Sequence, residues 1–141
     1  MDKLVVDASV VVKWFVVEPH SNEARRVLEA YESGAVSFHA PDILPAEFAS
    51  TIWKKQLFQD LAETDAKDIL AAFRRLQMLF TPTVALLDDA YKLAVTHRRS
   101  IYDALYLALS LREKCRLVTA DERFVNALAG SQSQVIWLGS W

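Results

Sequence analysis

The sequence contains a single cysteine, Cys115, so no disulfide can form within the chain. It has only 3 glycines and 4 prolines, which favours helices joined by short connections. No stretch reaches the roughly 18 apolar residues of a membrane-spanning helix, because Asp7 and Lys13 interrupt the apolar N-terminal region. No secretory signal pattern is recognisable either. Together these absences predict a protein of the reducing cytoplasm.

Neither sign of charge dominates the chain. Its 16 Lys and Arg residues against 18 Asp and Glu residues give a formal net charge of −2. This balance supplies no bulk attraction for nucleic acid, so RNA binding would need a local basic patch or bound cations. The length of 141 residues and a hydrophobic fraction of 52% predict one globular domain covering residues 1–141.

Short apolar runs alternate with helical patterns along the chain. The expected strands are residues 4–6, 36–40, 83–86, 116–119 and 134–137. The expected helices are residues 10–15, 22–33 capped by Ser21 or Asn22, 42–58 capped by Asp42, 61–80, 88–96, 101–111 capped by Ser100, and 121–128. This alternation predicts an α/β fold, in which a parallel sheet carries helices on both faces.

Four acidic residues stand out by their positions. Asp7 directly follows the first expected strand, and Asp121 follows the fourth. Glu47 lies in the helix after the second strand, and Asp103 is the only acid in the helix 101–111. Because open parallel sheets bind ligands at the carboxyl ends of their strands, Asp7 and Asp121 are expected at such a site.

Each acid also has a purely structural interpretation. Asp7 is suited to cap the helix that follows it. Residues 100–103 and 119–122 both have the capping-box pattern, and Glu47 fits a solvated helix face. Taken one residue at a time, these interpretations are as good as the functional one.

The surroundings of Asp103 favour a functional role. Its helix is apolar on all sides, which is typical of a buried helix. Two carboxylates about 4 Å apart repel by roughly 4 kcal/mol at an effective dielectric of 20, so a cluster must raise its pKa values or bind a cation. Oxygen-only ligands indicate a hard ion, Mg²⁺ or Mn²⁺.

Other chemistries have little support. The three histidines are scattered away from the cysteine, which excludes a zinc-ligand motif, and no nucleotide-binding loop or nucleophile elbow is present. A phospho-accepting receiver domain would need an early acidic pair and a Lys after a late strand, where this chain has Asp121. A phosphatase using Asp7 as nucleophile would usually carry a second Asp two residues later, where this chain has Ser9.

Four segments together resemble the PIN-domain family, particularly the VapC-type toxins of toxin–antitoxin pairs. They are residues 5–10 (VVDASV), 45–48 (PAEF), 100–109 (SIYDALYLAL) and 117–124 (LVTADERF). No single segment is diagnostic, but all four in this order cover almost the whole chain. The segment around Asp103 is the most specific.

The resemblance implies a three-layer α/β/α sandwich on a parallel sheet of about five strands. It implies Mg²⁺ or Mn²⁺ bound by Asp7, Glu47, Asp103 and Asp121, with Thr119 and Ser9 supporting the ligands or the attacking water. Endonuclease activity on RNA such as tRNA or rRNA would follow. Glu122 is the nearest candidate for a further acid that the family often carries.

The same resemblance implies partners. A small antitoxin would block the site, and the helices 42–58 and 61–80 would serve homodimerisation and antitoxin binding. Candidate RNA contacts are Arg98, Arg99 and Lys13, although cations at a helix C-terminus are also favoured by the helix dipole. A non-catalytic PIN module that only binds RNA or protein is the alternative, and the presence of all four acids argues against it.

Overall fold

A computed structural model describes residues 1–141, and its centre is a single sheet in the order β3-β2-β1-β4-β5. All neighbouring strands are parallel. The strands are β1 (Asp2–Val6), β2 (Val36–Pro41), β3 (Leu79–Thr81), β4 (Arg116–Thr119) and β5 (Val135–Trp137). The helices, with 3-10 turns written η, are α1 (Ala8–Val11), η1 (Val12–Trp14), α2 (Ser21–Glu32), α3 (Leu44–Phe58), α4 (Glu63–Arg74), α5 (Thr83–His97), α6 (Ile101–Glu113), α7 (Glu122–Ala127) and η2 (Leu138–Ser140).

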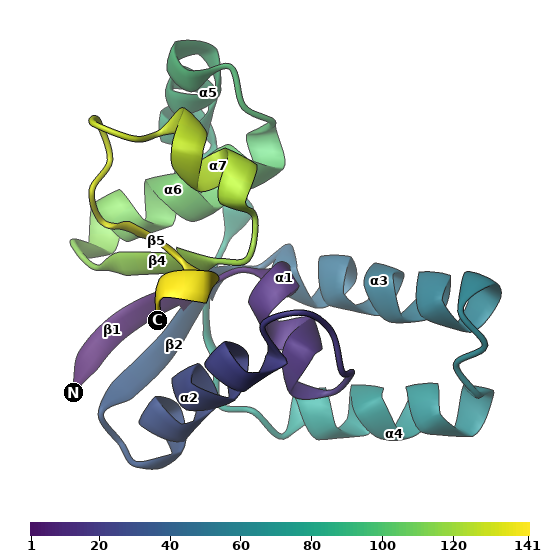
Figure 1. Cartoon of the computed structure of the whole chain (residues 1–141). Helices are drawn as coiled ribbons and strands as arrows, with labels where there is room; N and C mark the ends of the chain where they lie inside the picture. The colour runs from purple at the N-terminus through teal and green to yellow at the C-terminus, as the bar shows by residue number, and fades with distance from the viewer.

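Helices cover both faces of the sheet, so the predicted α/β/α sandwich is confirmed (Figure 1). Helix α6 packs across β1, β2 and β4, while α2 packs on β2 and α1 contacts the end of β4. Helices α3 and α4 run side by side and extend away from the sheet, as Figure 1 shows. None of the helices combines the length and apolar character that a membrane crossing requires.

The core lies between the sheet and these helices. Leu4, Val5 and Val6 of β1 are fully buried, because β1 has a strand on each side and helices on both faces. In α6 every residue from 104 to 110 is buried, which confirms that its all-round apolar pattern marks a buried helix. Helix α6 carries Asp103 in its first turn and ends beside the start of β1, where Glu113 pairs with Lys3 at 2.7 Å.

The strand order reverses at β1. The chain passes from β1 to β2 on one side and returns much later to β4 on the other, so the carboxyl ends of β1 and β4 flank the switch point. Asp7 directly follows β1, and Ala120 and Asp121 follow β4. The expected position of Asp7 and Asp121 at this edge is confirmed, and it is where open parallel sheets bind ligands.

The expected helix 61–80 and strand 83–86 were wrong. Helix α4 ends at Arg74, and Leu79–Thr81 forms edge strand β3, paired only with β2. The helical spacing of apolar residues continues through Leu76 and Leu79, so periodicity alone could not reveal the strand. Residues 83–86 instead form the first turn of α5, which begins directly after Pro82 and not at Asp88 or Asp89.

Two expected helix caps were also wrong. Ile43, not Asp42, precedes α3, and the Asp42 side chain instead accepts a 2.9 Å hydrogen bond from the backbone N–H of Thr83 at the start of α5. His20, in a left-handed conformation, precedes α2, while Ser21 is its first residue and accepts from the Glu18 N–H. Both differences arise because the side chains bond to backbone outside the helices they were expected to cap.

Candidate active site

Asp7 is placed where β1 gives way to α1. It caps α1 as the structural interpretation predicted, accepting hydrogen bonds from the backbone N–H and the hydroxyl of Ser9. The Ser9 hydroxyl also accepts from the Ala120 N–H at 3.1 Å, which ties the end of β1 to the end of β4. Burial raises the pKa of Asp7 to about 6, although hydrogen bonds from Ser9 and Thr119 oppose the rise. No basic side chain pairs with it.

Glu47 lies in the first turn of α3 and is half-buried. Its Oε1 accepts a 2.6 Å hydrogen bond from the hydroxyl of Tyr106 on α6. Burial raises the pKa of Glu47, and the negative charge of Asp103 raises it further. Glu47 in turn contributes to the raised pKa of Asp7. Glu47 therefore lies between Asp7 and Asp103, near enough to interact with both carboxyl groups.

Asp103 and Asp121 share a cation. The Arg99 guanidinium lies 2.9 Å from Asp103 Oδ2 and 3.7 Å from Asp121 Oδ2. Asp103 also completes the predicted cap, because its backbone N–H donates to the Ser100 hydroxyl. The capping role expected of Thr119 was wrong: Asp121 itself caps α7 through Phe124, and the Thr119 hydroxyl accepts from the Asp121 N–H at 3.1 Å.

The acids therefore form two adjacent groups. Asp7 and Glu47 carry raised pKa values and no ion pair, whereas Asp103 and Asp121 face Arg99. No three of these carboxylates are close enough to make a ready metal-ligand cluster. The donor chemistry still fits a hard divalent cation, because every group offers oxygen and the partly buried Asp7 carboxylate has no counter-ion.

The remaining predicted residues have different surroundings. Ser9 and Thr119 both touch this site through the hydrogen bonds above, and Glu122 and Arg98 are exposed. Lys13 is held by Glu18 at 3.1 Å. Tyr106 and Arg99 contact the acids in ways that were not predicted from the sequence. Tyr106 follows Asp103 by three positions on one helix, a spacing that could have placed it on the same face. The partnership of Arg99 with Asp121 joins two distant segments and has no local pattern.

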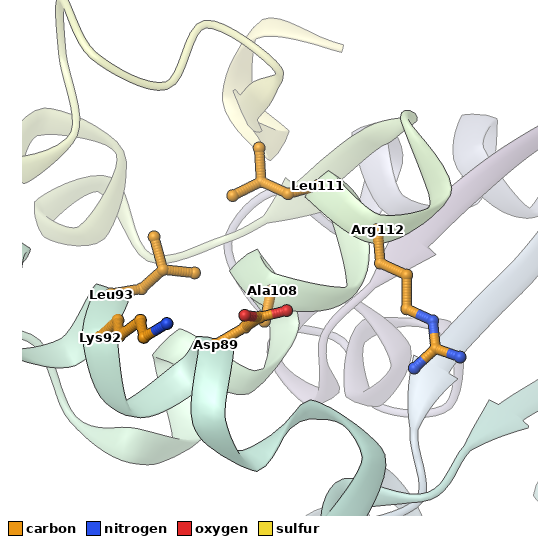
Figure 2. A pocket seen from close by; sticks show the side chains of 6 residues that line it. All are labelled: Asp89, Lys92, Leu93, Ala108, Leu111 and Arg112. Atoms are coloured by element: carbon orange, nitrogen blue, oxygen red, sulfur yellow. The ribbon is translucent and has the colours of Figure 1, made fainter.

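Several hollows adjoin α6, and two of them differ in their position relative to the acids. One, of about 530 Å³, opens beside Glu47 and is lined by Ala8, Ile43, Ala46, Glu47, Ser50, Thr51, Lys54 and Tyr102. The other, of about 350 Å³, lies between α5 and α6 and is lined by the six residues that Figure 2 labels: Asp89, Lys92, Leu93, Ala108, Leu111 and Arg112. None of the four acids lines the second hollow, so the first is the candidate entrance to the site.

The family model of the PIN domain matches residues 4–128, which include all four acids. This chain belongs to the PIN-domain family. A curated relative of this PIN domain, Ribonuclease VapC3 of Pyrobaculum aerophilum, is 34% identical over 125 residues, covering 86% of the chain and 91% of the relative.

Solved structures share the fold of this PIN domain. The crystal structure of PAE2754 from Pyrobaculum aerophilum has a TM-score of 0.66 at 18% identity, covering 99% of this chain and 92% of that one. VapBC2 from Rickettsia felis, bound to a DNA fragment from its promoter, has a TM-score of 0.65 at 15% identity, covering 96% of each chain. The predicted family and fold are thereby confirmed.

Proposed function

We propose that this PIN domain is a Mg²⁺- or Mn²⁺-dependent endoribonuclease and the toxin of a VapBC-type toxin–antitoxin pair. The observation that carries the proposal is the partly buried Asp7 carboxyl at the switch point, with a pKa of about 6 and no counter-ion. An acid of this kind is costly to the fold, which is typical of functional sites. The relative named as a ribonuclease supports RNA as the substrate.

Asp7, Glu47, Asp103 and Asp121 are the residues that would hold the cation. When bound, the cation supplies an activated water and offsets charge on the phosphate. The chain itself contributes orientation: Ser9 fixes the Asp7 carboxylate, and Tyr106 fixes that of Glu47. Hydrolysis by water, with no covalent nucleophile and no use of the 2′-hydroxyl, leaves 5′-phosphate and 3′-hydroxyl ends.

The partners follow from the same proposal. The substrate is a structured RNA such as tRNA or rRNA, with Arg98 as an exposed residue available to a phosphate. A cognate antitoxin and a second copy of the chain bind the protruding pair α3 and α4. The outer part of α3 supports this, because Trp53 is 52%, Leu57 51% and Phe58 78% exposed.

The test is cleavage of purified tRNA and rRNA with Mg²⁺ or Mn²⁺, followed by mapping of the new ends. We expect cleavage that EDTA abolishes, products with 5′-phosphate ends, and loss of activity in Asp103→Asn. Unchanged activity in Asp103→Asn would identify a contaminating nuclease. RNA binding without cleavage at any metal concentration would support the non-catalytic module, and a stable phospho-Asp7 after incubation with a small phosphodonor would support a phosphotransfer enzyme.

A further inference from the structure

Arg99 lies in the connection between α5 and α6 and reaches across the acidic site. Its guanidinium approaches Asp103 Oδ2 at 2.9 Å, from the first turn of α6, and Asp121 Oδ2 at 3.7 Å, at the start of α7. One cation therefore holds two of the four acids, which come from segments separated by strand β4. The guanidinium therefore occupies the position between two carboxylates where a divalent cation would be expected to bind.

The guanidinium is held in this position by more than charge. It lies over the ring of Phe124, with 5.2 Å between Arg99 Cζ and the ring centroid. The Arg99 side chain is 23% exposed, and its Nε is buried without a hydrogen-bond partner. On the surface, this N–H would be hydrogen-bonded to water. Burying it unsatisfied costs free energy, so the contacts with the carboxylates must offset that cost and hold the side chain in this position.

The neighbouring residue makes the contrast clear. Arg98 carries the same charge one position earlier, but it is exposed and forms no ion pair. Its left-handed backbone, with φ of 53°, turns the chain out of α5. Only Arg99 faces the acids, while Asp7 and Glu47 on the other side of the site have no cation at all.

We propose that Arg99 is a built-in counter-ion that competes with the divalent cation for Asp103 and Asp121. The inference rests on the proposed function, because it assigns a regulator to that metal site. In the metal-free protein the single charge of Arg99 is shared between two of the four acids, which stabilises the apo fold. A divalent cation must displace the guanidinium from Asp103, so Arg99 weakens metal binding.

Isothermal titration with Mn²⁺ alone tests the inference on wild type, Arg99→Gln and Arg98→Gln. Arg99→Gln should bind Mn²⁺ about fivefold more tightly than wild type, the size expected for one partly exposed ion pair. Arg98→Gln removes the same charge from the adjacent residue and should stay within about twofold of wild type. Measured against Asp103→Asn alone, the gain from Arg99→Gln should be smaller in the double variant Arg99→Gln/Asp103→Asn, because only the 3.7 Å contact with Asp121 remains to be relieved.

Equal gains in both single variants would assign the effect to bulk charge and overturn the inference. So would unchanged affinity in Arg99→Gln, and either result leaves the proposed function intact as long as wild type binds Mn²⁺. A wild-type protein and an Arg99→Gln variant that both fail to bind Mn²⁺ would contradict the inference together with the metal dependence of the proposed function.

A second measurement needs no variant of Arg99. In ¹⁵N NMR of the wild-type protein, the Nε–H signal of Arg99 should shift on titration with diamagnetic Mg²⁺, while that of Arg98 should not. A Mg²⁺-bound protein whose Arg99 signal is unmoved would show that the guanidinium and the cation do not compete, and it would overturn the inference.

Discussion

The Tyr106 hydroxyl donates a 2.6 Å hydrogen bond to Glu47 Oε1 and so joins α6 to the first turn of α3. Tyr106 is itself buried, and burial together with the acceptor Glu47 raises its pKa. The phenol therefore stays protonated and keeps donating at every pH where the protein is folded. One carboxylate oxygen of Glu47 is fixed in direction, and the other remains available to a ligand.

Tyr106→Phe should reduce RNA cleavage strongly while reducing the stability of the fold only slightly. Loss of this hydrogen bond is expected to cost about 1–2 kcal/mol in the free energy of unfolding. Outer residues that orient metal ligands are worth about 10- to 100-fold in metal affinity or activity, so RNA cleavage should fall by about tenfold or more. Urea unfolding and single-turnover cleavage measure the two effects.

Tyr91→Phe is the control, because Tyr91 lies on the neighbouring helix α5 away from the four acids, is 64% exposed and forms no hydrogen bond through its hydroxyl. It should leave both quantities unchanged. If Tyr106→Phe cleaves RNA as fast as wild type, Tyr106 has no positioning role and only its packing matters.

The raised pKa of Asp7 predicts an inverse dependence of stability on pH. The folded pKa of about 6 lies above the unfolded value near 3.9, so the folded state binds more protons between them. In metal-free buffer, stability should therefore fall as the pH rises from about 4 to about 6, by up to about 3 kcal/mol, and stay level above. Other acids titrate in this range, so the difference from a variant is the measured quantity.

Asp7→Asn supplies that difference, because Asn also caps helices and keeps the backbone contact with Ser9. The variant should be more stable than wild type at pH 7.5 in EDTA, and the advantage should shrink towards pH 4. Thermal unfolding across this range measures it. An Asp7→Asn variant that is less stable than wild type at pH 7.5 would show that Asp7 is a structural cap and not a strained functional acid.

The ion pairs of Glu18 with Lys13 and Lys55 are predicted to stabilise the folded state. Its carboxylate pairs with Lys55 at 2.5 Å and with Lys13 at 3.1 Å, and both lysines are nearly buried. Burial alone would raise the pKa of Glu18, but these two lysines lower it overall. Its stabilising effect should be complete above the unfolded pKa near 4.3 and be lost as the pH falls through the lower folded value.

Glu18→Gln leaves two lysines without a carboxylate and should cost about 2 kcal/mol at pH 7, less than a fully buried pair because Glu18 is partly exposed. Glu63→Gln is the control, since its pair with Lys67 at 3.2 Å is exposed on both sides. Denaturant unfolding at pH 7 compares them. If both substitutions lowered the free energy of unfolding equally, the ion pairs of Glu18 would contribute no more to stability than an exposed pair.

The sequence predicted the parts of the fold that depend on strong local patterns. The buried strands around Val5 and Val118 and the apolar helix at Asp103 are long or apolar enough to be recognised alone. Their ends fix the positions of Asp7 and Asp121, because parallel strands end at one edge of the sheet. The short edge strand β3 was missed because it has three residues and a single neighbour, and its residues are largely exposed.

The polar contacts of the site depended on tertiary structure. Asp42 accepts a hydrogen bond from the Thr83 N–H at the start of α5, and Arg99 reaches Asp121 from the connection after α5, contacts that no local spacing reveals. Side chains with several possible backbone or ionic partners choose among them only after the elements have packed. The four candidate acids were selected from the sequence alone, whereas the contact of two of them with Arg99 and the lack of a counter-ion at the other two depend on tertiary structure.

The proposed metal site is tested most directly by single-turnover RNA cleavage in Mn²⁺ by Asp7→Asn beside Glu32→Gln. Both remove one acidic charge, but Glu32 is exposed at the end of α2, whereas Asp7 lies at the switch point. We expect Asp7→Asn to lose at least about 100-fold in rate, as removal of the proposed metal ligand should, and Glu32→Gln to stay within about threefold of wild type. An Asp7→Asn variant that folds and cleaves RNA at the wild-type rate would contradict the account.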